Sequence, residues 1–331
     1  MRLKALVCGG HGFIGHHLAQ YLMAHDYWVR TVDINDYVYG DLDVDDYVVA
    51  DLRDPNICDQ VTRAPDGKPF SEVYQLGAWM GGAGVIFTGD HDAQVMYDSG
   101  LINLNMAEAC RKNRAGKVFY SSSACVYNHL LQLDTDNPGL KETMAYPAFP
   151  DSEYGFEKLF SERMWLSYAR NYHMDIKIAR FHNVFGIEGA WDNGKEKFPA
   201  ACCRKVAQAK DGDTIEIWGD GDQTRSFLYI DECLEGVRRL MDSDFAGPVN
   251  IGSDEIISIN DLVEMAKDIA SKPNIKIDHV PGPLGVRGRT SDNTLIKEKL
   301  GWAPSRPLRE GMEKLYVWIE SQVKQGKKDV K

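Results

Sequence analysis

The stretch Leu3-Lys-Ala-Leu-Val-Cys8, followed by Gly9-Gly-His-Gly12-Phe-Ile-Gly15, decides the fold. Its apolar run predicts a β-strand, and its spaced glycines predict a tight turn that leads into a helix. A second apolar run, residues 28–32, predicts another strand and ends at Asp33, 18 positions after the last glycine (33 − 15). Strand, glycine turn, helix and strand in this order make one unit of a parallel sheet. We therefore expect an α/β fold.

The same unit predicts a dinucleotide cofactor. Glycines let the backbone approach a pyrophosphate at the N-terminus of the helix, and the acid after the second strand accepts a hydrogen bond from the adenine ribose. Because Asp33 disfavours a 2′-phosphate and no arginine directly follows it, we expect NAD rather than NADP. A third apolar run, residues 47–50, would place the two residues after it beside the adenine. The expected cofactor contacts are Gly9, Gly12, Phe13, Ile14, Gly15, Asp33, Asp51 and Leu52, together with Tyr154 and Lys158 farther along the chain.

Composition limits the classes of partner. The formal charge of the 331 residues is −11, from 38 Lys and Arg against 49 Asp and Glu, and no block of like charge occurs. This argues against nucleic acid or an anionic membrane as a partner. No apolar run approaches the roughly 18–20 residues of a membrane span, and we expect no signal peptide, because the first residues lead directly into a strand. The seven cysteines form no C-x-x-C pair, so we expect reduced thiols in a cytoplasmic protein and no metal site.

A tyrosine and a lysine predict acid/base chemistry. The short apolar run 117–120 leads directly into Ser121, Ser122 and Ser123, which places these serines at the carboxyl end of a parallel strand, where such sheets bind ligands. On a helix expected over about residues 152–172, Tyr154 and Lys158 are four residues apart and share a face. A lysine beside a tyrosine favours the phenolate and lowers the pKa of the tyrosine. We therefore expect a base that acts on a hydroxyl during hydride transfer.

Segments spread over nearly the whole chain carry a resemblance to a known family. They are Met80–Gly82, Ser122–Tyr127, Tyr154–Lys158, Arg180–Asn183, Glu196–Ala201, Trp218–Phe227, Val249–Glu255, Gly285–Arg289 and Ile296–Trp302, together with the G-x-x-G-x-x-G loop. The chain resembles the extended short-chain dehydrogenase/reductases, the NAD-dependent epimerases and dehydratases of nucleotide sugars. Within that group it resembles the GDP-mannose 3,5-epimerases. The resemblance implies a Rossmann-type doubly wound parallel sheet with a smaller C-terminal substrate-binding lobe.

The resemblance also implies a reaction. Tyr154, helped by Lys158 and Ser123, would deprotonate the C4 hydroxyl of GDP-mannose while NAD takes the C4 hydride. The resulting ketone acidifies the hydrogens on C3 and C5, and inversion then needs two acid/base groups on opposite sides of the ring. By resemblance these are Cys125 and Lys197. Return of the hydride would give GDP-L-galactose, with GDP-L-gulose left open as a product.

Substrate contacts fall in the second half of the chain. A diphosphate needs cations, and Lys205, Arg225 and Arg289 supply them. With the contacts that the resemblance implies, the expected substrate-binding set is Gly82, Asn183, Lys197, Lys205, Gln223, Arg225 and Arg289. Two positions depart from the family pattern. Trp79 stands where an acid is common, and Asn128-His-Leu-Leu replaces a Pro-Glu pattern, so the sugar that binds is left open.

Lobe boundaries and assembly follow from the family. The NAD-binding lobe is expected over residues 1–181 and 228–252, and the nucleotide-sugar lobe over 182–227 and 253–331. The helices near residues 102–111 and 152–172 are expected to pair across a homodimer, as in family members.

Two other functions remain open. The first is an epimerase or a 4,6-dehydratase that acts on a different GDP-sugar such as a GDP-heptose, although Ala124-Cys125-Val126 lacks the Thr-Asp-Glu expected of a dehydratase. The second is a non-catalytic NAD-sensing regulator, which would have no need for Ser123, Tyr154 and Lys158.

Overall fold

The computed structural model describes residues 2–137, 139–327 and 329. Its centre is a seven-stranded parallel sheet in the order β11-β6-β5-β4-β1-β2-β3. The strands are β1 (Lys4–Cys8), β2 (Trp28–Asp33), β3 (Asp46–Val49), β4 (Glu72–Gln75), β5 (Lys117–Ser123), β6 (Asp175–Phe181) and β11 (Val249–Ile251). The order reverses direction between β1 and β4. The predicted α/β fold with a doubly wound Rossmann-type sheet is confirmed.

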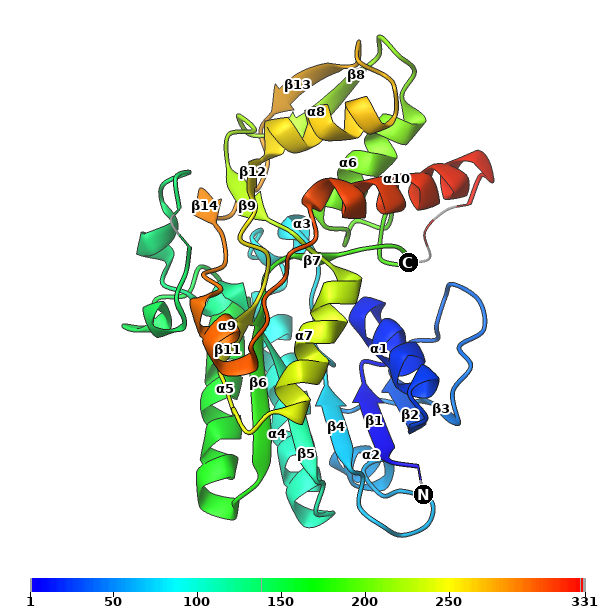
Figure 1. Ribbon diagram of the computed structural model, residues 1–331, viewed down its shortest axis with the longest axis vertical. Helices are drawn as coiled ribbons and strands as arrows, with labels where there is room; N and C mark the ends of the chain where they lie inside the picture. Colours follow the sequence, from blue (N-terminus) through cyan, green and yellow to red (C-terminus); the bar gives the residue numbers. More distant parts are fainter. Residues whose placement is uncertain (1, 138, 328, 330–331) are drawn as a thin grey trace.

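Helices cover both faces of the sheet (Figure 1). Helix α1 (Phe13–Ala24) packs against α7 (Ile230–Asp242) on one face. On the other face, α4 (Asp92–Lys112) packs against both α2 (Pro55–Val61) and α5 (Glu153–Tyr172). Helix α4 begins ten residues before the position that the sequence predicted (102 − 92). The predicted start of α5 is confirmed, because Ser152 caps it by accepting a hydrogen bond from the Gly155 N–H at 3.2 Å.

The remaining elements form a smaller lobe at the top of Figure 1. They include helices α6 (Phe198–Gln208), α8 (Ile259–Ile269) and α10 (Leu308–Lys324), the parallel pair β8 (Thr214–Trp218) and β13 (Lys276–Val280), and the three-stranded sheet of β12 (Ile256–Ser258), β9 (Thr224–Ser226) and β14 (Gly288–Arg289). Short elements join the lobes: α3 (Ala83–Ile86), β7 (Val184–Phe185) paired with β10 (Leu228–Tyr229), and the 3₁₀ turns η1 (Ala124–Val126), η2 (His129–Gln132) and η3 (Glu142–Ala145). Helix α9 (Thr294–Leu300) packs against β11 of the large sheet.

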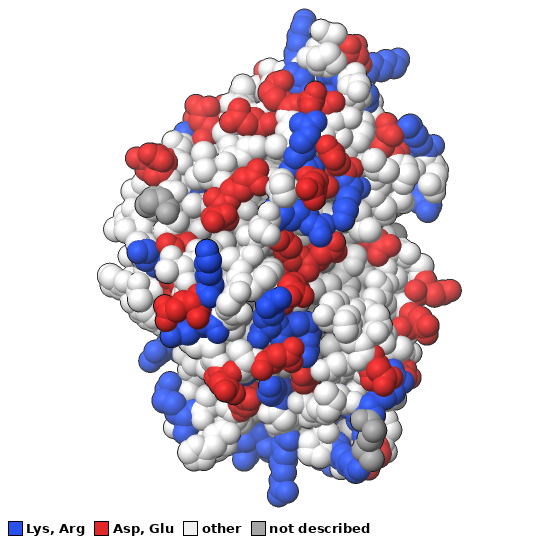
Figure 2. Space-filling model, viewed as in Figure 1, with Lys and Arg blue, Asp and Glu red and all other residues white. Residues whose placement is uncertain are grey.

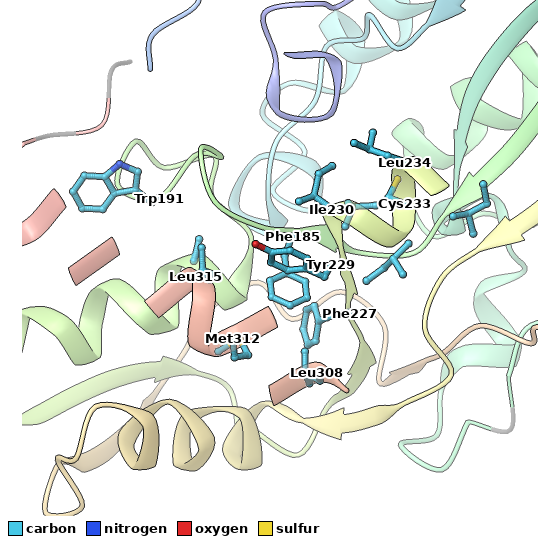
Figure 3. Packing of buried hydrophobic residues seen from close by; sticks show 14 of the residues in the cluster. Phe185, Trp191, Phe227, Tyr229, Ile230, Cys233, Leu234, Leu308, Met312 and Leu315 are labelled. Carbon is cyan, nitrogen blue, oxygen red and sulfur yellow. The ribbon is translucent and has the colours of Figure 1, made fainter. Parts of the chain in front are cut away.

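One hydrophobic cluster runs through both lobes. The sheet side contributes Val7 and Leu18, and the crossing strands contribute Phe185 and Tyr229. Figure 3 shows these two rings grouped with Phe227 and with Leu308 and Met312 of α10. Burial of such side chains stabilises a fold by about 1.5–3 kcal/mol each. The shared core therefore fixes the small lobe over the carboxyl ends of the strands.

Charges of both signs intermingle on the face seen in Figure 2, as the lack of a like-charge block in the sequence predicts. Within the described part of the chain, no helix combines the length and the apolar character that a bilayer crossing requires.

Candidate active site

The glycine loop between β1 and α1 is shaped for close approach. Gly9 has φ +73°, and a Cβ added at Gly15 would lie 2.0 Å from the Gly9 carbonyl oxygen, so helix and loop touch only because both residues are glycine. Gly12 precedes the helix, and no side chain caps the N–H groups of its first turn. Free N–H groups at a helix N-terminus attract a diphosphate. These residues fit the pyrophosphate of a dinucleotide.

The other predicted cofactor residues lie around this loop. The Asp33 carboxylate, at the end of β2, accepts hydrogen bonds from the N–H groups of His11 (3.3 Å) and Asn35 (3.1 Å). Asp51, beyond β3, is instead bound by the Arg53 guanidinium at 2.7–3.0 Å. Leu52 is buried, Ile14 packs against the main core, and the ring of Phe13 lies against Gly186 and Gly189. Contact of these residues with the cofactor stays a prediction.

Three elements bring Ser123, Cys125 and Tyr154 together. Ser123 ends β5, and its Oγ accepts a hydrogen bond from the Cys125 N–H at 3.2 Å, which starts the turn η1. A Cβ at Gly155 would lie 2.2 Å from the Cys125 carbonyl oxygen, so this glycine lets α5 rest directly on η1. Cys125 and Tyr154 consequently share a small buried cluster with Val95.

Burial, and not Lys158, has the largest effect on the pKa of Tyr154. The Lys158 Nζ donates a hydrogen bond to the Ser121 carbonyl at 2.9 Å and lies 5.7 Å from the centre of the Tyr154 ring. Burial raises the pKa of Tyr154 above its ordinary value, and the hydrogen bond with Ser123 only partly opposes this. Burial also lowers the pKa of Lys158. Burial in the protein therefore favours the protonated phenol, and a positive charge beside the ring would favour the phenolate.

Cys125 faces an arginine that arrives from the small lobe. The Arg289 Nη1 on β14 donates a hydrogen bond to the Cys125 Sγ at 3.3 Å. The Arg289 Nε donates to the Gln132 Oε1 at 2.6 Å, and its Nη2 pairs with the carboxylate of Asp151. Burial raises the pKa of Cys125, Asp151 raises it further, and Arg289 lowers it. The sequence predicted Arg289 as a substrate contact, but it missed Asp151 and Gln132.

Lys197 approaches the same place from the other side. It stands at the N-terminus of α6, where a Cβ at Gly82 would lie 2.4 Å from the Glu196 carbonyl oxygen, so the loop of Gly82 lies against this segment. Burial lowers the pKa of Lys197, and the charge of Cys125 opposes this shift. The neighbouring Lys195 is exposed. Of these two lysines, Lys197 lines the cavity with Cys125 and Lys195 does not.

One cavity of about 380 Å³ between the lobes collects the predicted side chains. Its lining includes Ser123, Cys125, Tyr154 and Lys197 of the catalytic set and Gly82, Asn183, Lys205, Gln223, Arg225 and Arg289 of the substrate set. Lys158 is buried and is not one of the residues that line this cavity. Further lining residues that the sequence did not single out are Phe87, Arg204, Pro283 and Leu284. These come from loops and small-lobe elements without a motif of their own.

The polar side chains of the small lobe are oriented by backbone groups. The Arg225 guanidinium donates to the carbonyls of Leu284 (3.1 Å) and Val286 (2.5 Å), so it fixes the loop before β14. Burial lowers the pKa of Arg225 to about 9. Gln223 is buried and donates from Nε2 to the Trp218 carbonyl at 3.3 Å, whereas its Oε1 has no partner among the described residues. That oxygen is an acceptor held ready at the cavity.

Two further substrate candidates are already engaged. The Asn183 Nδ2 donates to the Ser226 carbonyl at 3.0 Å, and Asn183 itself has φ +40°. The Lys205 Nζ donates to the Glu216 carbonyl at 2.6 Å at the edge of the cavity.

The two departures have distinct structural roles. Trp79 packs against the buried cluster of Val95, Cys125 and Tyr154, with its ring centre 4.9 Å from that of His91, so it adds an apolar wall to the cluster that holds the reactive groups. Asn128 caps η2: its Oδ1 accepts from the Leu130 N–H at 2.9 Å. The departure at Asn128 therefore stabilises the turn η2, while the departure at Trp79 places an indole beside the cluster that holds the reactive groups.

One cluster has the composition of a metal site. The ligand atoms of His16, His17 and Glu188 lie within 4.8 Å of one another. Internal contacts already occupy them, because the His16 Nε2 pairs with the Glu188 Oε2 at 3.2 Å and the His17 Nε2 bonds the Ile187 carbonyl at 3.0 Å. The cluster therefore anchors the residue 186–189 loop to α1.

Comparison with known proteins agrees with this geometry. The model of the NAD dependent epimerase/dehydratase family matches residues 5–252. This chain belongs to that family. The GDP-mannose 3,5-epimerase of Arabidopsis thaliana is 45% identical over 327 residues, which cover 98% of this chain and 84% of the relative. GDP-mannose 3,5-epimerase 1 of Oryza sativa subsp. indica is 43% identical over 328 residues, which again cover 98% of this chain and 84% of the relative.

A solved structure shows the same fold. The UDP-glucose 4-epimerase of Thermotoga maritima superimposes with a TM-score of 0.85 at 23% identity and covers 97% of this chain and 100% of that one.

Proposed function

We propose that the protein is a GDP-mannose 3,5-epimerase. The observation that carries this proposal is the presence of two separate acid/base side chains, Cys125 and Lys197, in the cavity that also holds Tyr154. A 4-epimerase needs one base at C4, whereas inversion at C3 and C5 needs groups that reach the ring from different sides. The 43–45% identity to GDP-mannose 3,5-epimerases over nearly the whole chain supports the same reaction.

The first task is oxidation at C4. Bound NAD supplies the hydride acceptor and the positive charge of its nicotinamide ring. Tyr154 takes the proton of the C4 hydroxyl, and Ser123 stabilises the oxygen of the phenol as that proton moves. Lys158, fixed by the Ser121 carbonyl, keeps the helix face of Tyr154 in register with the end of β5.

The second task is proton exchange at the carbons beside the ketone. Cys125 approaches the sugar from η1, and Lys197 approaches from the start of α6. Each step breaks a C–H bond, places the proton on one of these side chains and returns a proton from the other face. Burial favours the uncharged form of both, since it raises the pKa of the Cys125 thiol and lowers the pKa of the Lys197 amine, which favours the thiol as a proton donor and the amine as a proton acceptor.

The substrate sits between two lobes in this proposal. Residues 1–181 and 228–252 hold the cofactor, and residues 182–227 and 253–331 hold the nucleotide sugar, with α9 placed beside the large sheet. Arg225 and Lys205 provide positive charge at the cavity for the diphosphate. The free Oε1 of Gln223 accepts a hydrogen bond from the ligand.

A second candidate is epimerisation of a different GDP-sugar, such as a GDP-heptose. The apolar wall that Trp79 forms beside Cys125 and Tyr154 favours it, because an indole cannot accept a hydrogen bond from a sugar hydroxyl as an acid would.

A homodimer through α4 and α5 is also part of the proposal. These helices pack side by side and carry the exposed apolar side chains Tyr97, Leu104, Phe156 and Phe160. In a single chain these side chains are in contact with water, and pairing of two chains would bury them. Light scattering should give the mass of two chains; the mass of one chain would remove the homodimer. A cytoplasmic location fits the seven cysteines, all of which are thiols.

The test is turnover of defined sugars by the purified protein with NAD. GDP-mannose should yield new GDP-hexoses with no net reduction of the cofactor, and GDP-L-galactose should be identified by NMR against a standard. A GDP-heptose and UDP-glucose serve as comparison substrates. Conversion of the heptose alone would move the proposal to the second candidate, and no conversion of any sugar would contradict both.

A further inference from the structure

Arg289 does more in this structure than line the substrate cavity. It is 5% exposed, and each of its three nitrogens has a protein partner: the Cys125 sulfur, the Gln132 amide oxygen and the Asp151 carboxylate. Guanidinium carries five N–H groups, so this arrangement uses three of them and leaves two for a ligand. The side chain is therefore oriented before any substrate arrives.

The Asp151 partner is unusually buried for a carboxylate. Its side chain is 1% exposed, and its other oxygen accepts a hydrogen bond from the Ser152 Oγ at 2.8 Å. Removing one member of a buried ion pair leaves the other charge uncompensated and destabilises the fold. Asp151 lies three residues before Tyr154 and follows Pro150, so the same turn that starts α5 also fixes the arginine.

We propose that Cys125, Arg289 and Asp151 form one charge-setting unit, in which Arg289 stabilises the Cys125 thiolate and Asp151 is a positioning residue that holds the guanidinium and offsets part of its charge. The unit rests on the proposed acid/base role of Cys125. When the sulfur takes a proton from carbon, the C–H bond breaks, an S–H bond forms and the thiolate charge disappears. The reverse step forms the thiolate again, and the Arg289 guanidinium lies where it can stabilise that negative charge.

Other titratable side chains also face the Cys125 sulfur, and Arg289 and Asp151 act in their presence. Tyr154 and Lys158 face it from α5, Lys197 faces it from the start of α6, and Arg225 faces it from β9. Only Arg289 among the described cations donates a hydrogen bond to the sulfur. Burial and Asp151 raise the pKa of Cys125 and Arg289 lowers it, which agrees with the geometry.

The experiment measures how fast iodoacetamide alkylates Cys125 in the NAD-loaded protein as a function of pH. Mass spectrometry of the Cys125 peptide separates it from the other six thiols. A thiolate reacts and a thiol does not, so the pH midpoint reports the charge state of the sulfur.

In R289Q the midpoint should rise, and alkylation at a fixed pH below it should slow by about tenfold or more, as expected when an opposite charge within a few ångströms is removed. In D151N the midpoint should fall and alkylation should quicken. R289K and D151E, which keep the charges, should stay near the wild-type midpoint. The matched control is R287Q: Arg287 lies two residues away, pairs with surface Asp220 at 2.9 Å and should change nothing.

Equal pH midpoints of alkylation in wild type, R289Q and D151N would overturn the proposal and leave Asp151–Arg289 as a structural ion pair. If R289Q does not fold, D151N decides: an unchanged or raised midpoint overturns the proposal. Alkylation needs no sugar, so this result is independent of whether GDP-mannose is turned over.

Discussion

Replacing Cys125 by alanine separates the two chemical tasks of the site. The variant keeps Cβ and loses one sulfur from a side chain that is 9% exposed. Loss of a buried group of this size costs about 1 kcal/mol of stability. Arg289 keeps Gln132 and Asp151 as partners, so the arginine should stay in place. The melting temperature should therefore fall only slightly, and NAD should still bind.

Activity should fall far more than stability. A positioned general acid or base contributes about 10²–10⁴ in rate, which corresponds to about 3–5 kcal/mol of transition-state stabilisation. Tyr154, Lys158 and Ser123 are untouched, so oxidation at C4 should continue. The assay mixes the variant with GDP-mannose and follows both reduced-nicotinamide absorbance and proton exchange at C3 and C5. We expect the absorbance signal to remain while exchange falls by at least about a hundredfold. Wild-type exchange at both carbons would refute the reasoning.

In Tyr154→Phe the C4 proton has no acceptor, so the transient absorbance of reduced nicotinamide should vanish on mixing with GDP-mannose; an undiminished transient would show that another group is the base. Lys197→Gln should abolish inversion at one or both carbons, while Lys195→Gln, at the exposed neighbour, should keep the wild-type rate; equal losses in the two variants would contradict the assignment. Burial lowers the pKa of His182 from 6.5 to about 3, so below pH 6.5 the unfolded chain takes up a proton that the folded chain does not. The free energy of unfolding should thus decrease as the pH drops from about 6.5 to about 3, and this residue should contribute up to about 1.4 kcal/mol per pH unit. Urea titrations of His182→Gln should show a smaller loss of stability over this pH range; an unaltered loss would contradict the lowered pKa of His182.

Local patterns predicted the parts of the molecule that local geometry determines. The glycine spacing predicted β1, the turn and α1, because a Cβ at Gly15 has no room against Gly9. The four-residue spacing of Tyr154 and Lys158 predicted their common helix, since α5 has a helical repeat from its cap onward. The strand that carries the serines extends to Ser123 rather than ending at Tyr120, because all three serines pair with β6.

Features that depend on tertiary contacts were not predictable in this way. Asp151 and Arg289 are 138 residues apart, and no spacing rule connects them. The pKa of Tyr154 depends mainly on burial in the assembled site, an effect that the spacing of Tyr154 and Lys158 could not show. Only the family resemblance distinguished Lys197 from Lys195, since both stand in one charged run and the distinction appears where Gly82 packs against the segment. Residues that act across lobes are thus the ones for which a structure is needed.

Proton NMR of GDP-mannose incubated with the NAD-loaded protein in D₂O tests the central claim most directly. The account predicts that deuterium enters at both C3 and C5 and that GDP-L-galactose accumulates, because Cys125 and Lys197 exchange protons at carbons on either side of the transient ketone. Retention of both C–H signals, with the protein folded and NAD bound, would contradict it.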